Sequence, residues 1–117
     1  MGIMKKTYTR KILFKTKDVE VVLITWPPGS RTPFHDHGKS HGLVRILKGE
    51  IAEEVFDKKT RKFLRRVVYK KEGACFESPD IIHRMLSASK TKIAESIHIY
   101  TPRLKMKNYD RLERSKK

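Results

Sequence analysis

Histidines form the clearest chemical pattern in this sequence. His35 and His37 stand on either side of Asp36. On a β-strand, residues i and i+2 project from the same face, so the two imidazoles can converge on one point while Asp36 faces the other way. Imidazole nitrogens bind iron, zinc, copper or nickel, although such pairs also occur in proteins without a metal. The pair predicts part of a metal site, and we expect Asp36 to be a structural hydrogen-bond acceptor rather than a ligand.

Two other segments place polar side chains on one strand face. Tyr8 and Arg10 are two positions apart, as are successive members of the series Ser96, His98 and Tyr100. If these faces point into a β-barrel, burying them without partners costs free energy, and a bound ligand that pairs with them removes that cost. The alternative is that the residues lie on a rim or in solvent.

The segments that must position these side chains are short and rich in β-branched and aromatic residues, which is typical of β-strands. Turn-forming residues such as Pro27-Pro28-Gly29 separate them, and no long helical period competes. Many short strands at near-regular spacing predict an all-β fold, an antiparallel sandwich or barrel. We expect strands over residues 8–14, 18–26, 43–48, 51–56, 62–70, 81–87 and 92–100.

Length and composition limit the class of protein. A chain of 117 residues has the size of one domain, so we expect a single domain over 1–117, with a core at about 8–103 and a basic tail at 104–117. Cys75 is the only cysteine, which excludes an intrachain disulfide, and we interpret it as a small buried hydrophobic residue. No apolar run reaches the roughly 18–20 residues of a membrane span, and residues 1–17 lack the apolar stretch of a secretory signal. These features predict a cytoplasmic protein that is not embedded in a membrane.

The charge balance raises the possibility of a nucleic-acid partner. Lys and Arg number 28 against 13 Asp and Glu, a net charge of +15. Basic residues concentrate in 57–71, where Phe63 and Tyr69 are interleaved, so a strand that follows phosphates is conceivable. No recognition motif accompanies the charge, and Lys and Arg on a hairpin commonly form a solvated face or protect an edge strand. We therefore expect a charged surface rather than a nucleic-acid-binding one.

Glycines around the histidine pair complete a longer motif. The spacing is Gly29, five residues, His35, one, His37, four, Gly42, six, Gly49. This resembles the first motif of the cupin superfamily, except that many cupins have a glutamate ligand at the position of Gly42.

The second cupin motif is present in an imperfect form. Gly73 is followed by Pro79 and then His83, but Ile81 stands where a glycine is usual and the spacing to the histidine differs by about one residue. The resemblance implies a small antiparallel jelly-roll barrel with a three-histidine metal site, made of His35, His37 and His83.

Four segments together resemble the cysteine dioxygenases, the thiol dioxygenase branch of the cupins. In chain order they are YTRKIL (8–13), HDHGKSHG (35–42), HR (83–84) and SIHIYTP (96–102). The resemblance implies that the three histidines bind Fe(II) and that free L-cysteine binds the iron before O2 oxidises its thiol to a sulfinic acid. Nickel or zinc could replace iron in a recombinant sample, since affinity alone does not favour Fe(II).

The resemblance also implies roles for the other polar residues. Arg10 binds the substrate carboxylate, with Tyr8 adding a hydroxyl contact. Tyr100 places its hydroxyl near the substrate at the end of a hydrogen-bonded series with Ser96 and His98. His41 matches a histidine of the family motif, and at most it orients a neighbouring ligand.

Position 42 separates this chain from the animal enzymes. Those have a cysteine there that cross-links to the active-site tyrosine, whereas Gly42 cannot form a cross-link to Tyr100, as is common in prokaryotic members. The Thr101-Pro102 bond aligns with a cis peptide of the family, so we expect it to be cis here.

Two other functions remain open. The first is a thiol dioxygenase that acts on 3-mercaptopropionate, which has a carboxylate but no amine; members of this type typically have Gln after the arginine, whereas Lys11 follows Arg10 here. The second is a non-catalytic cupin that binds or senses a small acid. The series that ends at Tyr100 argues against the second, because a binding pocket has no need for a tyrosine aimed at the metal.

Overall fold

The computed structural model describes residues 7–102 and 105–109. These residues contain strands and no helix, so the all-β class expected from the sequence is confirmed. Accordingly, none of them belongs to a helix long and apolar enough to cross a membrane. The ten strands are β1 (Thr9–Lys15), β2 (Glu20–Trp26), β3 (Phe34–Asp36), β4 (His41–Lys48), β5 (Glu50–Asp57), β6 (Phe63–Lys70), β7 (Ala74–Glu77), β8 (Ile81–Ser87), β9 (Ala94–Thr101) and β10 (Lys107–Tyr109).

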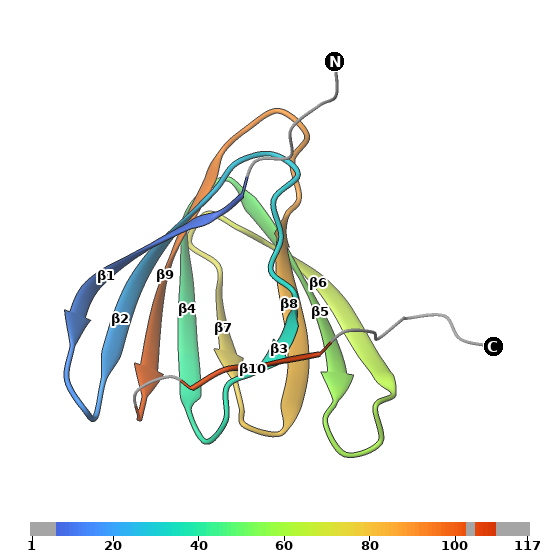
Figure 1. The fold of residues 1–117 in the computed structure, drawn as a ribbon. Helices are drawn as coiled ribbons and strands as arrows, with labels where there is room; N and C mark the ends of the chain where they lie inside the picture. The colour runs from blue at the N-terminus through green and yellow to red at the C-terminus, as the bar shows by residue number, and fades with distance from the viewer. Residues whose placement is uncertain (1–6, 103–104, 110–117) are drawn as a thin grey trace.

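The strands form two five-stranded sheets (Figure 1). The first has the order β1-β2-β9-β4-β7 and the second β10-β3-β8-β5-β6. Neighbouring strands pair antiparallel in both sheets, as in β2 with β9 and β5 with β8. Val44 and Ile46 of the first sheet pack in one core cluster with Ile51 and Met85 of the second, so apolar side chains join the two layers.

Three short strands were not among the expected ones. β3 and β7 span three and four residues, too few to show a period of two in the sequence. β10 lies within the basic tail expected over 104–117, where residues 107–109 pair with β3 and so extend the second sheet. Residues 103–104 and 110–117 of that tail lie outside the described part of the chain. The strand pairing of β10 comes from contacts that no local pattern reveals.

Alternation along the strands determines which side chains face the interior. In β2 every second residue is buried, from Glu20 to Trp26. β9 follows the same rule, and its buried residues from Ala94 onward include Ser96, His98 and Tyr100. The polar series of β9 therefore faces the interior, which is the first of the two alternatives that the sequence left open.

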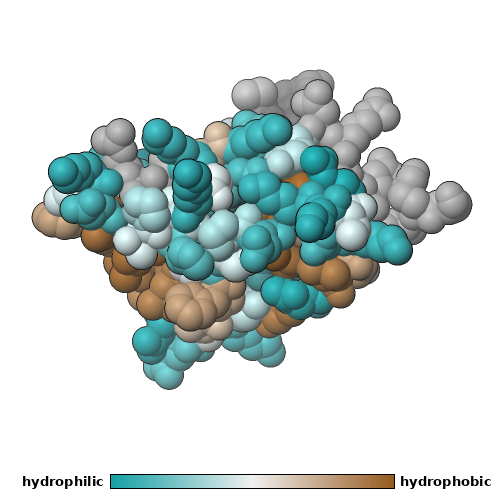
Figure 2. All heavy atoms as spheres, turned by 90° about the horizontal axis from the view of Figure 1, so that it is seen from below, coloured by the Kyte–Doolittle hydropathy of each residue, from teal (hydrophilic) through white to brown (hydrophobic). Residues whose placement is uncertain are grey.

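The basic segment 57–71 occupies the edge of the second sheet. β6 pairs only with β5 among the described strands, and most of its residues are exposed. Arg66 lies 3.3 Å from the buried Glu54 carboxylate. Figure 2 shows hydrophilic side chains over much of one face of the molecule, with apolar ones visible between them. The placement agrees with the interpretation of these residues as a charged edge strand.

We expect Phe56→Ala to lower the free energy of unfolding by about 3–5 kcal/mol, because it deletes a buried ring. Phe56 is 1% exposed and packs edge-on against Phe34 at 5.3 Å between ring centroids. Phe76→Ala is the matched control, since Phe76 is 77% exposed, and its effect should stay within about 0.5 kcal/mol. Urea unfolding followed by circular dichroism measures both, and equal effects would contradict this description of the core.

Candidate metal centre

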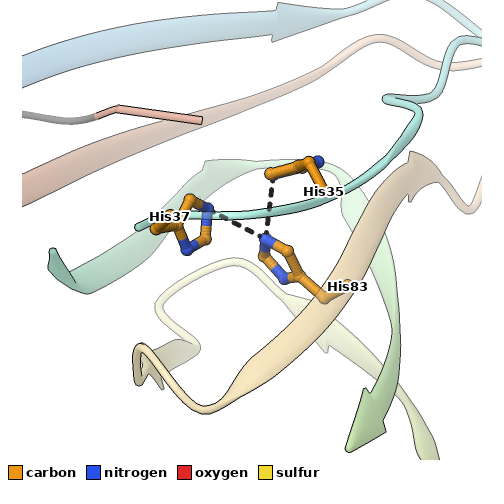
Figure 3. Close-up of side chains that lie close together, drawn as sticks. All are labelled: His35, His37 and His83. Carbon is orange, nitrogen blue, oxygen red and sulfur yellow. Dashed lines mark hydrogen bonds between the residues drawn. The ribbon is translucent and has the colours of Figure 1, made fainter. Parts of the chain in front are cut away.

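Three buried histidines converge between the two sheets. His35 lies on β3 and pairs across the sheet with His83 on β8, while His37 follows β3 directly. The Nε2 atom of His83 lies 3.2 Å from Nε2 of His35 and 3.1 Å from Nε2 of His37 (Figure 3). The structure therefore brings together all three residues that the sequence motifs singled out.

Hydrogen bonds orient two of the three rings. His35 donates from Nδ1 to the carbonyl oxygen of Pro33 at 2.8 Å, and His83 donates from Nδ1 to the carboxylate of Glu53 at 2.7 Å. A proton on Nδ1 leaves the Nε2 lone pair directed at the centre of the cluster, which is how proteins fix metal-binding histidines. Nδ1 of His37 has no hydrogen-bond partner among the described residues.

The distances and the donor atoms fit a metal ion. An ion about 2.0–2.1 Å from each nitrogen holds its ligands about 3.0–3.4 Å apart, close to the separations found here. Burial lowers the pKa of His35 to about 3 and that of His37 further below its usual range. Burial acts the same way on His83, but the carboxylates of Glu77 and Glu53 outweigh it and raise its pKa. Neutral His35 and His37 are in the form that binds metals.

The polar series of β9 forms a continuous chain of hydrogen bonds toward this centre. Trp26 donates from Nε1 to Ser96 Oγ at 2.9 Å, Ser96 Oγ lies 2.7 Å from His98 Nε2, and His98 Nδ1 lies 3.0 Å from the Tyr100 hydroxyl. Because the indole can only donate, the Ser96 proton is available for His98 Nε2. In that arrangement His98 donates to the tyrosine oxygen, and the hydroxyl proton of Tyr100 is left for the site.

Tyr100 lies beside the histidines. Its ring centroid is 5.2 Å from that of His37. Burial raises the pKa of Tyr100 well above its usual value, so the hydroxyl keeps its proton. Burial also lowers the pKa of His98 to about 3, which keeps this imidazole neutral.

Tyr8 and Arg10 lie nearer the solvent than the other polar residues of the site. Tyr8 is half-buried and stacks on Trp26 with ring centroids 5.3 Å apart. The Arg10 side chain is 30% exposed, and its Nη2 lies 3.8 Å from the carboxylate of Glu20. The charge of Arg10 is among the smaller influences, after burial and His83, that lower the pKa of His98. Arg10 is thus a partly solvated cation within electrostatic range of the buried relay.

The remaining sequence predictions have mixed outcomes. Asp36 accepts hydrogen bonds from the Gly38 amide and the Tyr109 hydroxyl, so its expected structural role is confirmed. Cys75 is half-buried against the core, and burial raises its pKa. His41 is exposed on β4, on the face opposite to the buried Gly42, so the structure does not bring its side chain to the three histidines.

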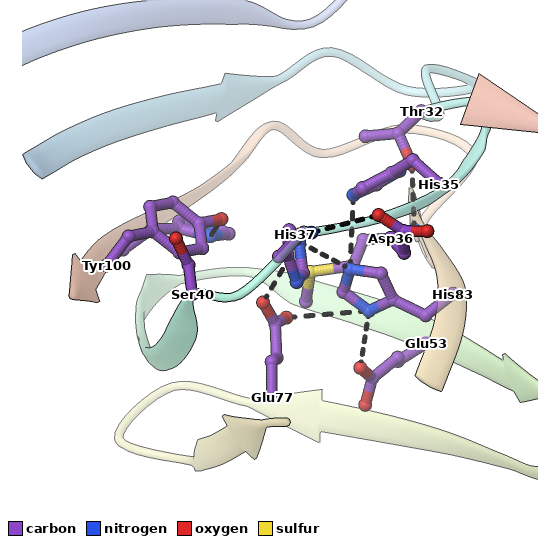
Figure 4. Close-up of polar contacts among 12 residues, drawn as sticks. Thr32, His35, Asp36, His37, Ser40, Glu53, Glu77, His83 and Tyr100 are labelled. Carbon is purple, nitrogen blue, oxygen red and sulfur yellow. Dashed lines mark hydrogen bonds and ion pairs between the residues drawn. The ribbon is translucent and has the colours of Figure 1, made fainter. Parts of the chain in front are cut away.

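Two buried carboxylates adjoin the histidines, and sequence reasoning missed both. Glu53 binds His83, and its other oxygen accepts from Tyr69 at 3.3 Å. Glu77 lies with Oε1 3.5 Å from His37 Nε2 and Oε2 3.5 Å from His83 Nδ1 (Figure 4), and burial raises its pKa to about 7.

Local patterns give little warning of these two acids. Glu53 stands next to Glu54 in a strand that is buried on both faces, so alternation cannot say which one faces the histidines. Glu77 ends β7, whose alternation of Ala74, Cys75, Phe76 and Glu77 becomes meaningful only once the segment is known to be a strand.

The sequence profile described as cysteine dioxygenase type I matches residues 3–112. The chain belongs to this family. Cysteine dioxygenase type 1 of Homo sapiens is 28% identical over 102 residues, which cover 81% of this chain and 51% of the human protein. The Danio rerio protein of the same name is 27% identical over 103 residues, with the same coverage. The chain therefore spans about half the length of the curated relatives it matches.

Solved structures agree on the fold of this cysteine dioxygenase family member. A double-stranded β-helix protein from Klebsiella pneumoniae superposes with a TM-score of 0.72 at 14% identity, covering 94% of this chain and 90% of that one. The cupin domain of Schizosaccharomyces pombe Cnp3 gives a TM-score of 0.70 at 15% identity, covering 82% of this chain and 61% of that one. The expected cupin fold is confirmed.

Gly42, which has no side chain, lies between two residues of the metal centre. It pairs with Tyr100 on one side and Glu77 on the other, and a Cβ atom there would lie 2.9 Å from a Tyr100 ring carbon and 3.0 Å from Glu77 Oε1. A larger residue needs the neighbours to move, so there is no room for the glutamate that many cupins have at this position. The Thr101-Pro102 bond is cis, as expected from the family.

We expect Glu53→Gln to weaken divalent-metal binding about 10–100-fold, because the charged acceptor that orients His83 is replaced by an amide. Competition with a chromophoric chelator, using Zn(II), measures the dissociation constant. Tyr69→Phe is the control, since it removes the 3.3 Å hydrogen bond on the far oxygen of Glu53 and leaves the bond of Glu53 to His83 in place, so it should change affinity little. Wild-type affinity in Glu53→Gln would remove Glu53 from the support of the centre.

Proposed function

We propose that this chain is a mononuclear non-haem iron dioxygenase that oxidises the thiol of L-cysteine with O2 to cysteine sulfinic acid. The proposal rests on one observation above all. In a member of the cysteine dioxygenase type I family, Nε2 of the buried His83 lies 3.2 Å from Nε2 of His35 and 3.1 Å from Nε2 of His37. Tyr100, at the end of a buried hydrogen-bonded relay, lies beside these three imidazoles. Both atoms of O2 enter the product, so thiol and O2 alone balance the reaction.

His35, His37 and His83 would hold the iron through Nε2. Bound there, Fe(II) would supply the chemistry of O2 activation and stabilise the substrate sulfur as a thiolate. Three neutral ligands leave coordination positions for the substrate and O2, as open catalytic centres require. Nickel or zinc suits the same imidazole donors and is an alternative occupant of a recombinant sample.

Arg10 would bind the carboxylate of the substrate. A guanidinium matches a carboxylate with two parallel hydrogen bonds, which an ammonium does not. The contact of Arg10 with Glu20 is 3.8 Å long and partly solvated, so a substrate carboxylate can compete for the same cation. Tyr8, two positions before Arg10, would add a hydroxyl contact.

Tyr100 would donate its hydroxyl proton to the bound substrate. His98 Nδ1 lies 3.0 Å from the phenol oxygen of Tyr100, and Ser96 Oγ lies 2.7 Å from His98 Nε2, so these two hydrogen bonds orient the tyrosine. At the other end of this series, Trp26 donates to Ser96, and the ring of Tyr8 stacks on Trp26. Preorganised donors of this kind stabilise developing charge without reorganising during the reaction.

Anaerobic loading with Fe(II) followed by oxygen-uptake measurements tests the proposal. With L-cysteine we expect O2 uptake matched by an equal amount of cysteine sulfinic acid, and slower uptake with 3-mercaptopropionate. Faster turnover of 3-mercaptopropionate would assign the site to amine-free thiols. Tight binding of thiol without O2 uptake would indicate a non-catalytic cupin.

We expect Arg10→Ala to lower kcat/KM for L-cysteine about 10–100-fold, because the free energy of one charge-assisted hydrogen bond corresponds to a change of this size. Cysteamine, which has no carboxylate, should react equally with wild type and variant, because nothing in it contacts Arg10. Arg45→Ala, on an exposed position of β4, is the matched control for lost charge. An equal loss with both thiols would remove Arg10 from carboxylate recognition.

A further inference from the structure

Trp26 is a core residue that donates a hydrogen bond to the polar relay of β9. Its side chain is fully buried, packs in the core cluster that includes Met85, and stacks on the ring of Tyr8. Trp26 pairs with Ala94 at the start of β9, and Tyr100 lies near the other end of that strand. From residue 94 to residue 100 the strand extends about 20 Å, so the relay connects the hydrophobic core to a distant tyrosine.

Ser96 has one hydroxyl proton and two neighbours in the relay. Its Oγ atom lies 2.9 Å from Trp26 Nε1 and 2.7 Å from His98 Nε2, and these are its side-chain hydrogen bonds within the described part of the chain. The indole N–H donates and cannot accept, so it uses a lone pair of Ser96. Ser96 is fully buried, and a buried proton without an acceptor costs free energy, so the Ser96 proton points to His98.

A relay of serine, histidine and tyrosine can donate in either of two directions. In the forward direction Ser96 donates to His98 Nε2, and His98 donates from Nδ1 to Tyr100. In the reverse direction Tyr100 donates to Nδ1, and His98 donates from Nε2 to Ser96. The two distances, 2.7 Å and 3.0 Å, fit both directions, because each gap holds one proton either way. Burial lowers the pKa of His98 to about 3, so the neutral ring has a single N–H proton to place.

We propose that Trp26 is a positioning residue that sets the direction of the relay and thereby the orientation of the Tyr100 proton. In the reverse direction the Ser96 oxygen would accept from Trp26 and from His98 at once. Its own proton would then need a third partner, and the described part of the chain supplies none. The forward direction avoids this cost. The inference rests on the proposed function, in which the Tyr100 hydroxyl donates to the substrate.

The direction of the relay changes what Tyr100 offers to a substrate. In the forward direction its oxygen accepts from His98 and its O–H donates into the site, where a fixed donor stabilises developing negative charge. In the reverse direction the relay uses the same proton, and the site receives only an oxygen lone pair. Both directions fit the same heavy-atom positions, so Trp26 acts on the protons rather than on the packing.

The chain contains one tryptophan, so a tryptophan analogue supplied during expression replaces Trp26 alone. In benzothienylalanine a sulfur atom replaces the indole N–H, which removes the donor and keeps the fused ring that stacks on Tyr8. 5-Fluorotryptophan is the conservative counterpart, because it keeps the N–H. Nitrogen NMR of isotope-labelled histidine in the Zn(II)-loaded protein reports which ring nitrogen of His98 is protonated. The signals that disappear in His98→Gln assign that residue.

We expect His98 to be protonated at Nδ1 in the wild type and with 5-fluorotryptophan, and to gain a population protonated at Nε2 with benzothienylalanine. In the Fe(II)-loaded protein, kcat for L-cysteine per iron should fall about 2–10-fold with benzothienylalanine, because the free energy of one neutral hydrogen bond corresponds to a change of this size. 5-Fluorotryptophan should restore it. KM should change little, because the relay leaves Arg10 in place.

Each result decides a separate step of the inference. A wild-type His98 with its proton on Nε2 would overturn the forward direction without any variant. An Nδ1 proton that persists with benzothienylalanine would exclude Trp26 as its cause, and an altered tautomer with unchanged kcat would overturn the link to the reaction. If the analogue prevents folding, Trp26→Phe removes the same donor and carries the same expectations. Absence of O2 uptake by the wild type would count against the proposed function, whereas the NMR measurement tests Trp26 in either case.

Discussion

The pairing of β3 with β8 is the constraint on which the centre depends. His35 and His83 are opposite each other in this pairing, and His37 follows after one residue. A strand of three residues has few hydrogen bonds of its own, so its position comes from neighbours. Asp36 supplies the link, since it accepts from Gly38 at 2.9 Å and from Tyr109 of β10 at 2.6 Å and lies 3.5 Å from Lys58. The residue between the two histidines thereby fixes the direction in which both point.

The interior changes from apolar to polar along two adjacent strands. On β4 and β9 the inward pairs run from Ile46 with Ser96, through Val44 with His98, to Gly42 with Tyr100. The apolar end packs on Trp26, whose indole donates to Ser96 and so begins the relay. Within the relay, Ser96 is hydrogen-bonded to His98 and His98 to Tyr100, and these bonds offset the cost of burying the polar groups. The hydrophobic core and the relay are therefore continuous, and the core fixes the position of Tyr100.

Each buried acid of this barrel lies beside its own positively charged or imidazole group, such as Arg66 for Glu54 and His83 for Glu53. The net charge of +15 resides largely on exposed residues such as those of β6, whereas the interior contains carboxylates and imidazoles. Glu53 and Glu77 face the same histidine, and both raise its pKa. A divalent cation held by the three histidines would lie beside these two carboxylates, whose negative charge attracts it.

The sequence by itself predicted the all-β class and most of the strands, because alternation is a local property of the chain. Its resemblance to the cysteine dioxygenases pointed to the three histidines and Tyr100. The sequence also placed Asp36 correctly as an acceptor. The tertiary structure alone decided which faces point inward and which acids meet the histidines. Glu77 lies near them through the β4–β7 pairing and the lack of a side chain at Gly42, and His41 turns away although it lies in the same motif. Such contacts join residues far apart in the chain, so no local periodicity contains them.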